Sequence, residues 1–116
     1  MKTSLTYVSA LVAALATQAS AYDCWRNTDD AGRWRDALSP ADRLVELCKQ
    51  GDGEHCHQAE AGKMCVSGPG NEAFCNFIWG WAGSQQSWHG DWFLWSDITC
   101  DGGVGGSGDD VHVRIL

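Results

Sequence analysis

Basic residues are scarce in this chain: it has eight lysines and arginines against fifteen aspartates and glutamates. Without Lys2, which lies in an amino-terminal segment considered below, seven basic residues face fifteen acidic ones, a net charge of −8. Nucleic-acid backbones and anionic lipid surfaces repel such a chain on average. We therefore expect no nucleic-acid partner.

The basic residues that are present do not form an unbroken patch. The stretch WRNTDDAGRWR, at 25–35, holds Arg26, Arg33 and Arg35 between tryptophans. Asp29 and Asp30 interrupt this stretch, so a salt-bridged, solvated surface is favoured over an anion-binding one.

A long apolar run is also missing after residue 21. Residues 1–21 have a basic start at Lys2, a short apolar run over 8–16 and small residues, ASA, at 19–21. These features predict a secretory signal peptide that is too short to span a bilayer as an anchor. We expect a secreted, extracellular and monomeric protein of one domain, residues 22–116, without membrane insertion.

Catalytic motifs are lacking as well. The sequence has no nucleophile elbow, zinc-protease helix or phosphate-binding loop. The fragment WHGDW at 88–92 places His89 and Asp91 close together, but it specifies no reaction. Two carboxylates that hydrolyse a glycan stay an open alternative. We expect no enzyme and no cofactor.

Six cysteines are present, all after the amino-terminal segment. An even number in a short exported chain predicts three disulfides, which would stabilise a core of about 95 residues by ~2–4 kcal/mol each. The alternative for the run CKQGDGEHCHQAEAGKMC, 48–65, is a metal site that includes His55 and His57. An oxidising compartment disfavours the thiolates that metal binding needs, so we expect no metal. The cysteines are Cys24, Cys48, Cys56, Cys65, Cys75 and Cys100.

Local patterns predict the order strand–helix–strand–strand–helix–strand. YDCWR is extended, and LSPADRLVELCKQG predicts a helix with Ser39 as N-cap and Gly51 as terminator. The next two strands are expected on either side of the turn Gly-Pro-Gly-Asn, the second over 74–81. SWHGDWFLWSDITC, 87–100, predicts a helix because its tryptophans recur at i, i+4 and i+7. The carboxyl-terminal DDVHVRIL predicts a strand after a glycine-rich loop, 100–110.

This order predicts a small disulfide-stapled α+β fold, an α/β sandwich in which an antiparallel sheet packs against two helices. The seven tryptophans supply large apolar area, so core packing is their first interpretation. The alternation over 74–81 instead puts Trp79 and Trp81 on one strand face. An exposed row there would stack on sugar rings of a cell wall, which makes glycan binding the alternative.

The cysteine spacing resembles that of fungal killer toxins of the killer protein four type. Seven- and eight-residue gaps through Cys48, Cys56 and Cys65 are similar to those of the family, as are YDCWRN, GKMCVSGPGNEAFCNF, SDITC and GSGDDVHVRIL. The chain lacks two further family cysteines, one after Cys24 and one after Cys100. The resemblance implies a Cys24–Cys100 bridge. For the remaining four cysteines we expect Cys56–Cys75 and Cys48–Cys65.

The resemblance also implies a toxin or effector that binds a target on other cells without covalent chemistry. In this family the target is a calcium channel, and an exposed lysine near the matching cysteine contributes much of the effect. Lys63, two residues before Cys65, stands in that place. A rigidly held cation is a reasonable plug for a vestibule lined with carboxylates. A membrane channel or another cell-surface component is thus the expected partner, while an ordinary surface lysine is the alternative.

Overall fold

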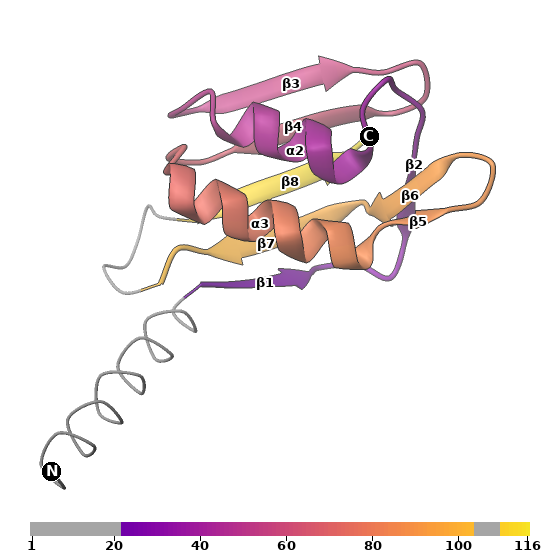
Figure 1. Cartoon of the computed structure of the whole chain (residues 1–116). Helices are drawn as coiled ribbons and strands as arrows, with labels where there is room; N and C mark the ends of the chain where they lie inside the picture. Colours follow the sequence, from indigo (N-terminus) through magenta and orange to yellow (C-terminus); the bar gives the residue numbers. More distant parts are fainter. Residues whose placement is uncertain (1–21, 104–109) are drawn as a thin grey trace, which may run out of the picture.

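The computed structural model describes residues 22–103 and 110–116. The predicted signal peptide and most of the glycine-rich loop, 104–109, lie outside these residues. Two helices cover one face of a five-stranded antiparallel sheet (Figure 1). In spatial order its strands are β1 (Asp23–Arg26), β7 (Asp97–Asp101), β8 (Val111–Ile115), β4 (Lys63–Ser67) and β3 (Glu54–Gln58). The small disulfide-stapled α+β fold is therefore confirmed.

A second, three-stranded antiparallel sheet adjoins one end of the helices. Its strands, in spatial order, are β2 (Ala31–Trp34), β6 (Trp92–Trp95) and β5 (Ser87–Trp88). The two helices are α2 (Pro40–Cys48) and α3 (Glu72–Gln85), which pack against each other. The sequence did not predict this second sheet.

Helix α2 forms where its end signals place it. Ser39 has an extended backbone, and its hydroxyl accepts a hydrogen bond from the backbone N–H of Asp42 at 3.3 Å. Pro40 occupies the first helical position, where its missing N–H removes no helical bond. Leu44 and Leu47 face the core from the buried side of the helix. The predicted first helix is confirmed.

The five-stranded sheet has an apolar inner face and a polar outer face. Val111, Val113 and Ile115 of β8 alternate inward and are buried, as the carboxyl-terminal pattern predicted. His112 and Arg114 alternate outward. His112 is 2.6 Å from Asp97 of the neighbouring strand β7, and Arg114 reaches past β4 to pair with Glu54 of β3 at 3.1 Å, so polar contacts between strands stabilise the outer face.

The predicted strand over 74–81 is wrong, because this segment lies in α3. Asn71 caps the helix by accepting a hydrogen bond from the N–H of Phe74 at 3.0 Å. Phe74, Cys75, Ile78 and Ala82 then form a buried stripe of helical spacing. The alternation of aromatic and small residues imitated a strand, and Gly80 and Gly83 weakened the helical signal.

The Gly-Pro-Gly-Asn turn does reverse the chain, but it joins a strand to a helix instead of two strands. Gly70 has φ +78°, in the left-handed region that favours glycine. A Cβ there would also lie 2.5 Å from the Cα of Gly51, after α2. The turn is thus packed closely against the end of α2.

The predicted helix over 87–100 is wrong too: β5, β6 and β7 occupy it. Gly90 has φ +81° between β5 and β6, which no continuous helix accommodates. Trp88 and Trp92 are directly opposed in this hairpin, with ring centroids 5.2 Å apart. The i, i+4 spacing that suggested a helix also brings residues together across a tight hairpin.

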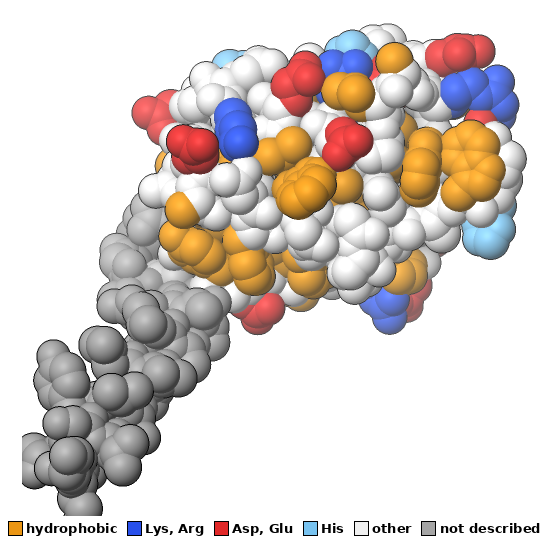
Figure 2. Space-filling view, viewed as in Figure 1, with side chains coloured by type: hydrophobic (Ala, Val, Ile, Leu, Met, Phe, Trp, Pro, Cys, Tyr) orange, Lys and Arg blue, Asp and Glu red, His pale blue; other side chains and the backbone are white. Residues whose placement is uncertain are grey.

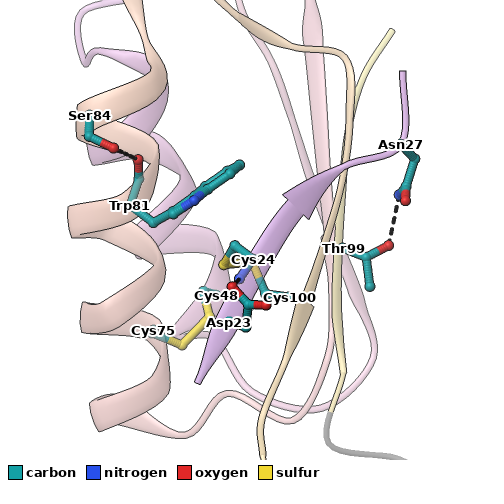
Figure 3. Close-up of a disulfide and its surroundings, with 9 residues drawn as sticks. All are labelled: Asp23, Cys24, Asn27, Cys48, Cys75, Trp81, Ser84, Thr99 and Cys100. Carbon is teal, nitrogen blue, oxygen red and sulfur yellow. Dashed lines mark hydrogen bonds between the residues drawn. A yellow bond between two sulfur atoms is a disulfide. The ribbon is translucent and has the colours of Figure 1, made fainter. Parts of the chain in front are cut away.

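The structure contains three disulfides, one as expected and two with exchanged partners. Cys24–Cys100 joins opposed residues of β1 and β7 and lies beneath α3, as implied by the resemblance (Figure 3). The expected Cys56–Cys75 and Cys48–Cys65 bridges are wrong. Cys48 pairs with Cys75, and Cys56 pairs with Cys65.

The position of α3 explains the exchange. Cys75 lies in the first turns of α3, where α3 packs on the end of α2, so it meets Cys48. Cys56 and Cys65 are opposed on the outer face of β3 and β4, with Cα atoms 4.1 Å apart. The sheet itself therefore separates Cys56 from Cys75.

Candidate functional site

The two tryptophans proposed for one strand face point in different directions. On a helix, residues two apart are about 200° apart around the axis. Trp79 is 48% exposed. Trp81 is partly buried against the core and projects from α3 toward β1 (Figure 3). The expected row of Trp79 and Trp81 is thus wrong, and only Trp79 is placed to meet a ligand.

Trp79 borders a groove of about 400 Å³ between the start of α2, the second half of α3 and β6. This volume falls within the ~300–1,000 Å³ typical of small-molecule sites. The lining combines two indoles with small and polar side chains: Ser39, Ala41, Asp42, Trp79, Gly80, Gly83, Gln86 and Trp92. Figure 2 shows hydrophobic side chains over the helices and over the β5–β6 hairpin, with largely uncoloured surface between them.

Two side-chain hydrogen bonds fix the groove between the helices. The indole Nε1 of Trp79 donates to Oδ1 of Asp42 at 2.8 Å, which orients the ring. Gln86, just after α3, accepts at its Oε1 a bond from the backbone N–H of Ala41 at 2.9 Å. This bond satisfies an N–H that the first turn of α2 leaves without a helical partner.

The groove floor is open because two helical positions lack side chains. A Cβ at Gly80 or Gly83 would meet nothing within 4 Å. Core packing therefore does not require either glycine, although each lowers helix propensity by roughly 1 kcal/mol relative to alanine. Their effect on shape is to leave the surface between Trp79 and Trp92 hollow.

The β5–β6 hairpin forms the side of the groove opposite the helices, and the buried carboxylate of Asp91 holds this hairpin in place. Asp91 is 6% exposed. Both of its oxygens accept bonds from β2 and the residue after it: Oδ2 from Arg33, and Oδ1 from Arg35 at 2.6 Å. The hydrogen bonds from Arg35 and Arg33 hold the pKa of Asp91 below its usual value against the effect of desolvation. Trp92 follows directly, so this anchor sets the far edge of the groove.

The structure also shows which interactions the side chains of the WHGDW fragment and of the arginines over 26–35 make. Asp91 is engaged by two guanidinium groups, and the ring of His89 lies near Phe93 instead, with centroids 6.2 Å apart. Arg26 pairs with Asp29 and lies over the Trp95 ring, 4.2 Å from its centroid. The interpretation of this stretch as a salt-bridged surface is confirmed.

His55 and His57 flank Cys56 but face the opposite side of the sheet. His57 is 3.5 Å from Asp36, whose carboxylate also accepts a bond from Arg43 at 2.7 Å. Desolvation acts to raise the pKa of Asp36, but the bond from Arg43 and further partners outweigh it, so the pKa is lowered. Both histidines are therefore placed under α2, away from the disulfide that they flank in sequence.

Within residues 22–103 and 110–116, one group of three potential metal ligands converges: Glu54, Cys56 and Cys65. Its two sulfur atoms are bonded to each other, so neither offers a thiolate. The Cys56–Cys65 disulfide consequently explains why these ligand atoms lie close together.

Lys63 lies on the other side of the molecule from the groove. It is exposed at the start of β4, on the outer sheet face that also holds the Cys56–Cys65 bridge. Two backbone bonds with Leu116, of 3.0 and 2.8 Å, fix its position. Because the sheet lies between them, Lys63 and Trp79 can be tested independently.

Sequence reasoning found Trp79 but missed Asp42, Gln86 and Trp92. Asp42 and Gln86 are ordinary polar residues in the sequence, and only helix packing brings them together. For Trp92 a signal existed: Gly90 and Asp91 between two tryptophans are typical of a tight hairpin turn.

Comparison with known proteins gives no relative: no family model, curated protein or solved structure matches the chain. None of the helices in the described part of the chain has the length and apolar character needed to cross a membrane. The assignment of a function consequently depends on the geometry of the groove and of the outer sheet face.

Proposed function

We propose that this protein is a secreted effector that acts on other cells by non-covalent binding, and that it binds a cell-surface glycan in the α2–α3–β6 groove. The observation that supports this proposal is the lining of the groove. Trp79 and Trp92 line the groove, and flat apolar rings of this kind suit the C–H faces of pyranose rings. Ser39, Asp42 and Gln86 supply the polar groups that sugar hydroxyls need beside such faces.

Replacement of Trp79 by alanine is expected to weaken binding to a soluble chitin or glucan oligomer about five- to thirtyfold. Loss of one well-placed aromatic face typically removes about 1–2 kcal/mol of binding free energy. The side chain is half exposed, so the fold should remain stable. Isothermal titration calorimetry of the two proteins against the same oligomer measures the change.

Two variants make this test specific to the groove. Trp25, on the edge strand β1, is 42% exposed and lies outside the groove, so Trp25→Ala should bind like the unmodified protein. Gly83→Leu keeps both indoles but fills the open floor, and it should bind as poorly as Trp79→Ala. Equal affinity of all four proteins would contradict glycan binding in this groove.

Inhibition of a calcium channel, as in killer toxins of the killer protein four type, is the second candidate. The observation that favours it is the placement of Lys63, exposed on a hairpin that a disulfide crosslinks. A cation held in this way suits a channel mouth lined with carboxylates. The net charge of the mature chain, −8, acts against long-range attraction to such a mouth.

This candidate predicts that the purified mature protein inhibits fungal or plant growth and that added calcium relieves the inhibition. Lys63→Gln should then reduce growth inhibition several-fold, because it removes the cation while preserving most of the side-chain length. Lys49→Gln, at the end of α2, is the matched control and should keep full potency. Unchanged potency of the Lys63→Gln protein would exclude this residue from the mechanism.

A further inference from the structure

We infer that the ligand of the groove is a cationic amino-sugar chain, of the glucosamine type, with its ammonium group paired to Asp42. This inference rests on the proposed glycan binding and names the class of sugar. The charge of the groove is what would select among sugars, since the two tryptophans would accept many pyranoses.

Among the described residues that line the groove, Asp42 has the one ionisable side chain. It is exposed, and the bond from the Trp79 indole uses its Oδ1. No bond of a neighbouring side chain to Oδ2 occurs among the described residues, which leaves this oxygen available to a ligand. The carboxylate therefore lies beside the ring on which a sugar would stack.

Asp42, in the first turn of α2, gives the groove its negative charge. Among the described residues, no lysine or arginine lines the groove to neutralise this carboxylate. A ligand with carboxylate or sulfate groups would thus be repelled, whereas a neutral glycan would gain stacking and hydrogen bonds but no charge–charge attraction.

An ammonium group adds two favourable terms to stacking on Trp79 and Trp92. It forms a charge-assisted hydrogen bond with the Asp42 carboxylate. It is also attracted to the faces of the two indoles, which are electron-rich. The net charge of −8 on the mature chain draws a polycation toward the surface before contact. The hydrogen bond, the attraction to the indoles and the long-range attraction all require the ammonium group, so they act only on a deacetylated sugar.

The test compares oligomers of glucosamine and of N-acetylglucosamine with the same number of sugar units. Calorimetry at low salt should show about five- to tenfold tighter binding of the glucosamine oligomer, the value expected for a partly exposed charged pair. Added sodium chloride at about 0.5 M should largely remove this preference because it screens the exposed pair. Equal affinity for the two oligomers at low salt would overturn the inference.

Asp42→Asn separates the charge of the groove from its shape. The asparagine carbonyl still accepts the bond from Trp79, so the ring keeps its orientation while the charge is lost. This variant should lose most of the preference for the glucosamine oligomer, and it should bind the acetylated oligomer as the unmodified protein does. Asp52→Asn, which changes the net charge by the same amount outside the groove, should keep the preference.

The two proposals fail in different ways. If the preference persists undiminished in Asp42→Asn, the ammonium is recognised elsewhere and the inference is wrong, while glycan binding through Trp79 still holds. If neither oligomer binds and Trp79→Ala changes nothing, glycan binding itself is wrong, and the inference fails with it.

Discussion

Replacement of Cys24 and Cys100 together by alanine should destabilise the protein more than removal of either other disulfide. The bond closes a loop of 76 residues, against 27 for Cys48–Cys75 and 9 for Cys56–Cys65. From the entropy of loop closure in the unfolded chain, the three contribute about 4.5, 3.6 and 2.6 kcal/mol respectively. The first value is comparable with the lower end of the total stability of a small domain, ~5–15 kcal/mol.

Urea unfolding of the three double-alanine variants, followed by circular dichroism, measures this order. Cys24 and Cys100 are both buried, so alanine leaves small cavities that add to the effect. The Cys56→Ala/Cys65→Ala protein is the matched control, because it also loses a bond between directly opposed strand residues. If the control lost as much stability as the Cys24→Ala/Cys100→Ala protein, loop length would not govern these bonds.

Trp34→Ala should remove about 3–5 kcal/mol of stability, the range typical of truncating a large buried aromatic. Trp34 is 0% exposed, at the end of β2, and contributes its whole ring to the hydrophobic core. Its Nε1 donates a bond to the carbonyl of Leu38 at 3.0 Å, and this acceptor would lose its partner. Thermal unfolding followed by circular dichroism measures the loss.

Two further proteins show whether the loss comes from burial. Trp34→Phe keeps most of the apolar volume and should lose less than Trp34→Ala, with the absent indole N–H as the main difference. Trp25→Ala removes an exposed ring and should change stability by no more than about 0.5 kcal/mol. A Trp34→Ala protein as stable as Trp25→Ala would contradict the central place of Trp34 in the core.

The tryptophans show why composition did not separate core from surface. Trp34 is buried, Trp81, Trp92 and Trp95 are partly buried, and Trp79 is exposed. The presence of seven tryptophans in a short chain is compatible with both core packing and ligand binding. Packing holds for the buried tryptophans, ligand binding stays a proposal for the exposed Trp79, and the direction of each side chain decides which interpretation can apply to it.

Local chemistry by itself determined several elements. Ser39 and Pro40 fixed the start of α2, because capping and a preset backbone angle act within one turn of helix. The alternation of Val111, Val113 and Ile115 determined β8, because a half-buried strand repeats every two residues. The even number of cysteines determined that the protein is crosslinked.

Tertiary structure decided α3, the β5–β6 hairpin, two disulfide pairings and the groove. The segments 72–85 and 87–95 carry patterns compatible with both helix and strand, so the packing of α3 on α2 and the Asp91 anchor selected the outcome. Which cysteines meet depends on the face of the sheet that each segment occupies, and fifteen pairings are open to six cysteines. The groove joins residues up to 53 positions apart, from Ser39 to Trp92, and no local pattern specifies such a distance.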